Sequence, residues 1–248
     1  MAKKARARAL MQQGIDCACV IHGDRYAWQY VENLRSMLVR HLPIDFRLHV
    51  FTEPTRTVPD PMIRHDLVEW DEVSNTKRAW WYKMQMFDPA HGLNRLLYFD
   101  LDVVITNSLA WVLDLNPNYF WAINDWRHLW KPHWRGLNSS MMFWERDRFS
   151  QPWEYVLAHA RRDMFRNFHG DQDLLTAVLP PDQVRYFDDQ RVRSWRWQIK
   201  DGGMDARTRK YARPGTGTVL PPETSVVVFH GHPKPHEVQD GVIEQHWR

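Results

Sequence analysis

Residues 95–106 read RLLYFDLDVVIT, and this stretch decides how the rest of the chain is interpreted. The apolar run Leu96–Phe99 and its continuation Val103–Ile105 have no polar face, which is typical of a buried strand rather than an amphipathic helix. Burial on both faces predicts a central, largely parallel strand. Two carboxylates, Asp100 and Asp102, interrupt the run.

The two aspartates predict a cation site. An unpaired buried carboxylate is costly, so buried carboxylates are usually paired or bound to a metal. Residues i and i+2 of a strand point to the same side, so Asp100 and Asp102 can bind one ion together, where the strand leaves the sheet. Their hard oxygen atoms suit Mg²⁺ or Mn²⁺. The alternative, which Asp-x-Asp alone favours, is a strand-end turn whose carboxylates cap loop amides.

Composition places the chain among globular proteins of one large or two small domains. It has 248 residues, of which 44% are hydrophobic, and this is enough for a sizeable core. Much of the net charge of +3 comes from Lys3, Lys4, Arg6 and Arg8, so we expect no nucleic-acid partner. We expect residues 1–14 to be a basic, disordered extension, for which a weak peripheral membrane contact is one open role.

Several absences bear on where the protein works. The sequence has no apolar run of about 18 residues, so we expect no transmembrane segment. No apolar stretch of the signal-peptide type follows the basic opening segment. Cys17 and Cys19 lie two apart in a predicted strand, a poor geometry for a disulfide, and are expected to be reduced core thiols. Together these features predict a cytoplasmic protein.

The first fifty residues predict the start of an α/β sheet. Residues 15–21 are a strand-like run, residues 27–42 repeat apolar side chains at helical spacing, and residues 46–52 alternate again. This order implies parallel strands joined by a right-handed crossover. Further strands are predicted over 119–124, 140–144 and 224–230, helices from a Thr76 cap to Phe87, from a Ser150 cap and over 171–179, and an alternating segment of uncertain type over 191–200.

Polar clusters border several of these predicted elements. Besides the aspartate pair, they are Gly23–Tyr26, Asn138–Ser140, Gly170–Asp173 and His230–His232. Open α/β sheets bind ligands beyond the carboxyl ends of their strands. We therefore expect the clusters to assemble one crevice.

Four motifs, YFDLD, LNSSMM, GDQDLL and FHGHPKP, carry a family resemblance. In this order they resemble those of retaining glycosyltransferase family 8, which includes glycogenin and bacterial lipooligosaccharide galactosyltransferases, and the likeness spans residues 19–236. It implies a single GT-A (Rossmann-like) α/β domain over residues 15–248, with a mostly parallel central sheet flanked by helices. It also implies metal-dependent transfer of a sugar from a nucleotide sugar, expected to be a UDP-sugar, with retention of configuration. The acceptor, whether glycan, lipid-linked or protein, is left open.

The resemblance also assigns roles to individual residues. The implied ligands of Mn(II), or Mg(II), are Asp100, Asp102 and His230. Basic residues near the donor diphosphate are Lys83 and Lys234, and Asp100 is shared with the donor site. The implied nucleotide-binding loop contributes Gly23, Asp24 and Tyr26. The residues expected near the donor sugar are Asp125, Asn138, Asp171 and Gln172, of which Asp171 and Gln172 are expected to face the anomeric carbon.

The sequence departs from the family pattern in three places. The last motif is two residues shorter and ends Lys234-Pro235-His236, which leaves open whether His230 or His232 is the metal ligand. Ser140 stands where glycine is usual. The family's acceptor segments are not recognisable in residues 125–136, where three tryptophans spaced by four fit either a packed helix face or a sugar-stacking wall.

Two other functions are compatible with the same residues. A catalytically silent nucleotide-sugar or glycan-binding module would be stabilised by UDP without turnover. A metal-dependent phosphohydrolase would cleave simple phosphate esters with no acceptor present, but it leaves the other motifs unexplained.

Overall fold

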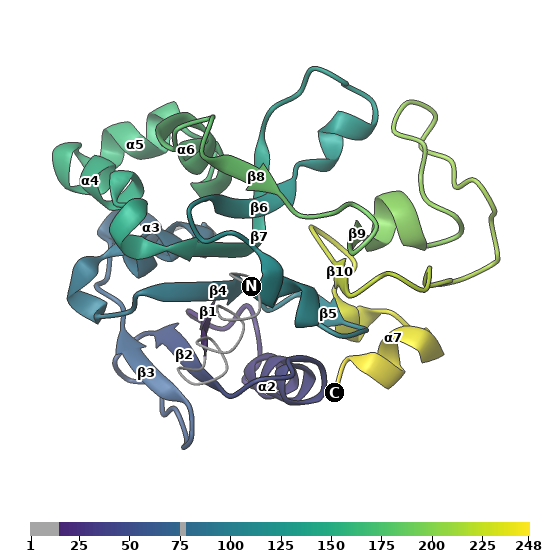
Figure 1. The fold of residues 1–248 in the computed structure, drawn as a ribbon, viewed down its shortest axis with the longest axis horizontal. Helices are drawn as coiled ribbons and strands as arrows, with labels where there is room; N and C mark the ends of the chain where they lie inside the picture. The colour runs from purple at the N-terminus through teal and green to yellow at the C-terminus, as the bar shows by residue number, and fades with distance from the viewer. Residues whose placement is uncertain (1–14, 75–77) are drawn as a thin grey trace, which may run out of the picture.

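The computed structural model describes residues 15–74 and 78–248, so the expected extension over residues 1–14 and the predicted cap Thr76 lie outside it. Its main sheet has seven strands in the order β3-β2-β1-β4-β7-β6-β8 (Figure 1). The strands are β1 (Ile15–Val20), β2 (Phe46–Thr52), β3 (Ile63–Asp66), β4 (Arg95–Phe99), β6 (Phe120–Asn124), β7 (Leu137–Glu145) and β8 (Val184–Tyr186). All neighbouring pairs are parallel except the two that β7 makes, with β4 and with β6. The predicted α/β class with a mostly parallel sheet is confirmed.

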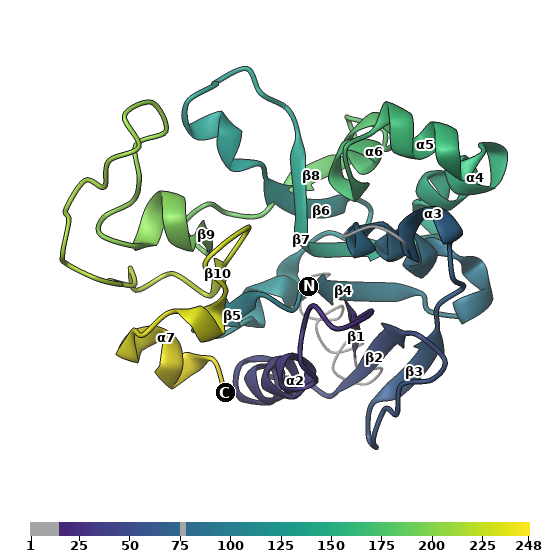
Figure 2. The ribbon, with the colours of Figure 1, turned by 180° about the vertical axis from the view of Figure 1, so that it is seen from behind.

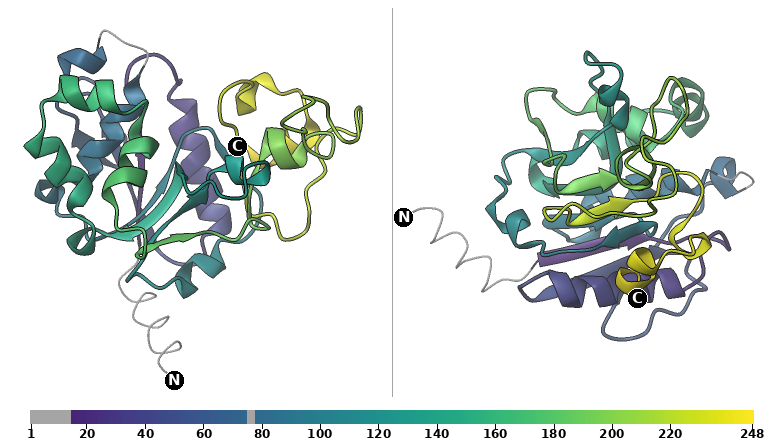
Figure 3. Two further views of the ribbon diagram at one scale, coloured as in Figure 1. Left: turned by 90° about the horizontal axis from the view of Figure 1, so that it is seen from above. Right: turned by 90° about the vertical axis from the view of Figure 1, so that its right-hand side faces the viewer.

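Helices cover both faces of this sheet, and the alternation of side chains along β4 explains why. Leu97 and Phe99 belong to the buried cluster that contains the inner face of α2 (Gln29–His41). Leu96 and Tyr98 point the other way, into the cluster of η1 (Ala79–Phe87), α4 (Gln151–Ala158) and α6 (Asp171–Val178). Seen from above, the green helices lie on one side of the sheet and the purple helix α2 on the other (Figure 3). Leu96–Phe99 of β4 thus face an apolar layer on each side of the sheet, as expected for a central strand.

A smaller sheet joins the end of the predicted central strand to the C-terminal part of the chain. It has the order β5-β10-β9, from β5 (Val103–Ile105), β10 (Val226–Val228) and β9 (Val192–Ser194). Seen from behind, it lies beside α7 (Gly241–His246) (Figure 2). The chain therefore changes sheets at residues 100–102, which form a turn. The apolar run 95–106 is two strands, and the expected departure from the sheet at the aspartates is correct.

Some predicted elements differ in detail from the structure. The helix ending at Phe87 is a 3-10 helix, and Ser150 begins α4 without a capping hydrogen bond from its side chain. The segment 191–200 is β9 followed by one π-helical turn, η6 (Trp195–Ile199). Five elements were not predicted from the sequence: β3, β8, α5 (Arg161–Asn167), α7 and the single turn α3 (Asp71–Ser74). These elements are too short to display a period, and neighbouring elements hold them in place.

The remaining short helices are 3-10 turns in the connections between the longer elements. They are η2 (Pro89–His91), η3 (Ala110–Asp114), η4 (Trp126–Leu129), η5 (Arg146–Arg148) and η7 (Pro235–Glu237). Cys17 and Cys19 are unbridged and fully buried, as predicted, and burial raises the pKa of both thiols. None of the helices in residues 15–74 and 78–248 has the length and apolar character that crossing a bilayer requires.

Candidate active site

Nine of the predicted site residues line one cavity of about 460 Å³ beyond the ends of the central strands. This volume is within the range of small-ligand sites, roughly 300–1,000 Å³. The nine are Lys83, Asp100, Asp102, Asp125, Asn138, Asp171, Gln172, His230 and Lys234. A larger groove of about 830 Å³ runs along α2 and the start of β2, but it contains none of the predicted residues. The convergence of separate polar motifs favours the smaller cavity as the functional one.

The Asp100 side of the cavity floor is a closed network of buried charges. The Lys83 ammonium lies 2.8 Å from Asp100 Oδ1 and 3.2 Å from Asp171 Oδ2. The Tyr98 hydroxyl donates to Asp100 Oδ1 at 2.6 Å, and Ser139 Oγ donates to Asp171 Oδ2 at 2.5 Å. Burial, the largest single cause, raises the pKa of Asp100, but the charge and hydrogen bond of Lys83, together with the hydrogen bonds of Tyr98 and Ser140, outweigh it and the pKa is lowered. This carboxylate is therefore held ionised.

The Asp102 side of the floor has its own lysine. Lys234 Nζ donates to Asp102 Oδ2, and the Tyr26 hydroxyl donates to the same oxygen at 3.0 Å. Burial and the neighbouring Asp100 charge nevertheless raise the pKa of Asp102. Lys234 thus neutralises Asp102 only in part.

The charges of the floor do not balance. Three buried or largely buried carboxylates, Asp100, Asp102 and Asp171, face two buried ammonium groups, those of Lys83 and Lys234. One negative charge is left over, and the pKa of Asp102 is raised first by burial and then by the neighbouring Asp100 charge. Buried charge of this kind favours binding of a cation.

His230 lines the same cavity from the segment after β10. Its ring stacks on Trp126, with ring centroids 4.7 Å apart, and its Nε2 is 2.7 Å from Ser194 Oγ. Burial, together with the positive charge of Arg196, lowers the pKa of His230 to about 4. The imidazole is therefore neutral at pH 7, the form that binds metals. His232 does not line the cavity: it is exposed and lies 3.0 Å from Glu237.

The donor set fits a divalent cation, although the side chains do not yet converge on one. Two carboxylates and a neutral imidazole line one cavity, whose floor has one more carboxylate than ammonium groups, and such oxygen and nitrogen donors suit Mn²⁺ or Mg²⁺. In the described part of the chain, however, no three His, Cys, Asp or Glu side chains are grouped closely enough to hold an ion. The predicted triad therefore stays a prediction.

The residues predicted near the donor sugar form a second wall of the cavity. Asn138 Nδ2 donates to Gln172 Oε1 at 3.3 Å, and Asn138 Oδ1 accepts from the Ser140 amide at 3.0 Å. Asp125 caps η4 by accepting from the Arg127 amide at 2.9 Å, and it also pairs with the Arg127 guanidinium. These polar groups face the cavity from β7, α6 and the end of β6.

The predicted nucleotide loop lies beside the cavity rather than in it. Gly23 and Asp24 line an adjoining hollow of about 640 Å³. Gly23 has a φ of +62°, a backbone region that favours glycine, and its carbonyl accepts from Arg56. Arg25 and Trp80 line both spaces. Tyr26 contributes to the floor through Asp102, as described above.

Arg25 and Ser139 belong to clusters that were expected at the crevice, but neither was given a role; Arg25 lines the cavity and Ser139 holds Asp171. Tyr98, which holds Asp100, and the lining residues Trp80, Arg196 and Trp197 were not expected at the site. The run Trp195-Arg196-Trp197 was a signal for Arg196 and Trp197, because alternating aromatic and cationic residues recur in ligand sites. Of the three tryptophans spaced by four, Trp126 is core, whereas Trp130 is exposed at the cavity.

Comparison with known proteins identifies the fold. No protein-family model and no curated protein matches the sequence. Among solved structures, an active-site mutant of LgtC matches at 15% identity over 93% of both chains, with a TM-score of 0.61. Galactosyltransferase LgtC in complex with donor and acceptor sugar analogs matches at 13% identity over 93% of both chains, with a TM-score of 0.60. GlyE, a glycosyltransferase of Streptococcus pneumoniae TIGR4, matches at 16% identity over 94% of this chain and 60% of its own, with a TM-score of 0.63.

These likenesses show that the chain has the GT-A fold and resembles LgtC of family 8 in architecture. The fold predicted from the four motifs is confirmed. At identities below 25% the likeness carries the fold alone, and function has to be argued from the cavity.

Proposed function

We propose that this protein is a glycosyltransferase that moves a sugar from a nucleotide sugar, expected to be a UDP-sugar, to an acceptor hydroxyl with retention of configuration. The observation that carries the proposal is the convergence, in one cavity of a GT-A fold, of side chains from five separate parts of the sequence. These parts are η1, the turn after β4, β7, α6 and the segment after β10. A phosphohydrolase needs the carboxylates but has no use for the Asn138 and Gln172 wall.

A bound divalent ion is part of the proposal. Asp100, Asp102 and His230 are the side chains that would hold it, and their surplus negative charge supports this assignment. Mn²⁺ or Mg²⁺ would supply charge stabilisation for the departing diphosphate. We assign Lys234 to binding of the same diphosphate, because its ammonium group contacts Asp102, one of the side chains that would hold the cation.

In the transfer, the oxygen of the acceptor hydroxyl forms a bond to the anomeric carbon of the donor sugar. The bond from that carbon to the diphosphate oxygen breaks, and its electron pair leaves with the nucleotide. We assign the hydroxyl proton to an oxygen of the leaving diphosphate. Asp171 is held by Lys83 and Ser139, so we assign it to positioning, and Gln172 is the side chain we place nearest the anomeric carbon.

The direct test is nucleotide release from a panel of nucleotide sugars, with wild type and Asp102→Ala compared at equal concentration. We expect release from one donor by the wild type alone, its loss on chelation, and an NMR spectrum of the product with the anomeric configuration of the donor. Identical behaviour of the two proteins with every donor would contradict the proposal. Binding of UDP without turnover would instead indicate the silent module.

A further inference from the structure

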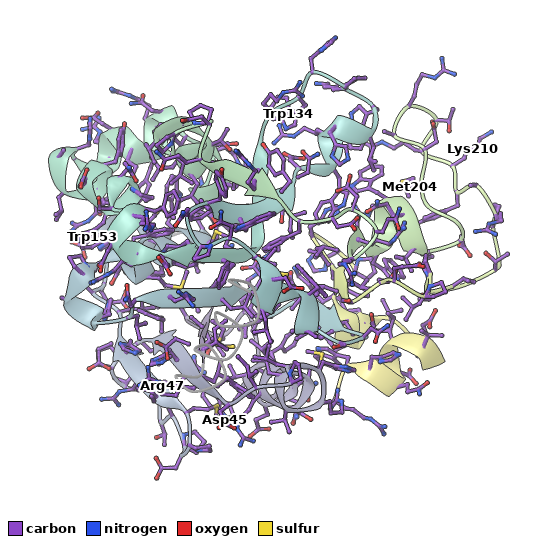
Figure 4. The ribbon with its side chains drawn as sticks, in the orientation of Figure 1. Asp45, Arg47, Trp134, Trp153, Met204 and Lys210 are labelled. Atoms are coloured by element: carbon purple, nitrogen blue, oxygen red, sulfur yellow. The ribbon has the colours of Figure 1, made fainter. Side chains whose placement is uncertain are left out.

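Two basic loops flank one side of the cavity. We call them the mouth loops: residues 125–136, between β6 and β7, and residues 195–217, after β9. Figure 4 labels Trp134 on the first, and Met204 and Lys210 on the second. Together they contain nine Lys and Arg residues and three Asp residues, an excess of six positive charges in a chain whose net charge is +3. The mouth is therefore far more positive than the protein as a whole.

The acidic side chains of the mouth loops bind groups within the loops themselves, so most of the Lys and Arg side chains there have no carboxylate partner in the described part of the chain. Asp201 Oδ1 accepts from the Gly217 amide at 2.7 Å, and Asp205 Oδ1 accepts from the Thr208 amide at 2.7 Å. Asp125 pairs with Arg127. Within the described residues, no ion pair involves any Lys or Arg of the second loop. The positive field of the mouth is consequently directed at solvent and at the cavity.

Arg196 brings this charge into the cavity itself. Its guanidinium donates to the carbonyl of His232 and has no carboxylate partner among the described side chains. It lines the same cavity as Asp102 and His230. A planar guanidinium beside a cavity suits a phosphate or a carboxylate, which it can bind through two parallel hydrogen bonds.

An exposed indole lies beside this arginine. Trp130 is 39% exposed, although it is a large apolar residue, and it lines the cavity with Trp197. The centroids of the two rings are 4.9 Å apart and their planes are inclined by 51°, and the Arg209 guanidinium lies over the Trp197 ring. Such an angled pair of rigid aromatic faces offers the apolar face of a sugar ring a large contact area at low entropic cost.

We infer that the acceptor is an anionic saccharide, with its sugar ring against Trp130 and Trp197 and its phosphate or carboxylate group at Arg196. The inference rests on the proposed function and names the substrate class that the mouth selects. The charge distribution also orients the acceptor, because the carboxylates of the floor repel its anionic group toward the mouth loops. The surplus charge further attracts such acceptors from solution, an effect that salt weakens.

The test compares three monosaccharide probes, methyl glucoside, glucose 6-phosphate and glucuronic acid, by saturation-transfer NMR and as acceptors. We expect the two anionic probes to bind more tightly than the neutral one, with a preference that falls as salt is raised. Comparison of glucose 6-phosphate with glucuronic acid shows whether the site prefers a phosphate or a carboxylate group. The variants Arg196→Gln and Trp130→Ala should each weaken anionic-probe binding about tenfold.

Lys210→Gln is the matched control, because it removes the same charge from an exposed position that does not line the cavity. It should change binding less than twofold, roughly the limit for a neutral surface substitution. Equal binding and equal use of neutral and anionic probes by a wild type that releases nucleotide would overturn the inference and leave the proposed function standing. If no donor is turned over, the proposed function fails and the acceptor assignment with it, and the NMR binding order then decides only whether the mouth binds anionic saccharides.

A basic surface also binds anionic membranes, and co-sedimentation with phosphatidylserine vesicles tests this outcome. Vesicle binding that Lys210→Gln and Arg196→Gln weaken equally, with no binding of the anionic probes, would assign the mouth to a lipid surface and overturn the inference.

Discussion

Two polar clusters sit on the same central sheet, and the residues of only one of them line the candidate active-site cavity. The first is the floor, where Asp100 and Asp102 meet Lys83 and Lys234. The second, which we call the histidine cluster, joins Asp16, His49, His65 and His91. His49 Nε2 lies 3.1 Å from Asp16 Oδ1, His49 Nδ1 lies 2.8 Å from His65 Nε2, and His65 Nδ1 lies 3.3 Å from His91 Nδ1.

The clusters differ in how their charges are compensated. Asp16 is paired with Arg47 as well as His49, and its pKa is lowered once these partners outweigh burial. Burial, with the neighbouring His49 and His91, lowers the pKa of His65 to about 4, so that ring is neutral at pH 7. The histidine cluster is thus self-contained, whereas the floor keeps a surplus charge turned toward a cavity. Burial of polar groups alone therefore does not mark a functional site.

The largest expected effect separates the clusters by activity. Asp102→Asn keeps the size of the side chain but removes the negative charge that would hold the cation, and the cation would in turn hold the donor diphosphate. We expect nucleotide release to fall about a thousandfold or more. Asp16→Asn makes the same chemical change in the histidine cluster and should leave turnover unchanged. If both variants retain turnover, or both lose it, the distinction between the clusters is wrong.

The next effect concerns stability. Lys83→Met leaves Asp100 and Asp171 buried without their shared cation. Removing one partner of a buried ion pair costs about 3–5 kcal/mol, so the free energy of unfolding should fall by that amount in urea titrations. Lys210→Met, on the exposed loop, should change it by less than about 0.5 kcal/mol. A loss below about 1 kcal/mol for Lys83→Met would show that the floor charges are not buried together.

The smallest effect is a pH dependence that belongs to the histidine cluster. Because the pKa of His65 is lowered from 6.5 to about 4 on folding, the unfolded chain binds more protons between these values. The free energy of unfolding therefore falls as the pH falls through this window. His65→Gln should make that decline shallower without affecting turnover at pH 7. An unchanged slope would mean that His65 is not buried as a neutral ring.

Much of the fold followed from local pattern, because long elements display their period. The predicted strand over residues 46–52 coincides with β2, and the helix predicted over 27–42 contains α2. The short strands β3 and β8 have no such signal, since pairing with β2 and β6 specifies them. The π-helical turn that carries Arg196 and Trp197 is likewise too short to show a period in the sequence.

The site was predictable to the extent that its residues lie at or beside strand ends. Asp100 follows β4, Asn138 lies at the start of the antiparallel strand β7, and His230 follows β10 of the smaller sheet. The three were expected in one crevice, and they line one cavity. Asp100 and Asp102 were expected to share one side of a strand, but they lie in the turn between β4 and β5 rather than on a regular strand. The ion pairs of the two aspartates were not predictable, because Lys83, which pairs with Asp100, and Lys234, which pairs with Asp102, lie far from them in the sequence.

The most direct measurement is the thermal unfolding of the wild type and of Asp102→Asn, each with UDP and Mn²⁺ and again with chelator. At a hundredfold excess over the dissociation constant, ligand adds about 2.7 kcal/mol, which corresponds to a rise in Tm of roughly 5–10 °C for a chain of this size. We predict this rise for the wild type with UDP and Mn²⁺, and its loss in the variant or with chelator. An equal rise in the variant, or one that survives chelation, would contradict the claim that the floor binds a nucleotide diphosphate through a cation.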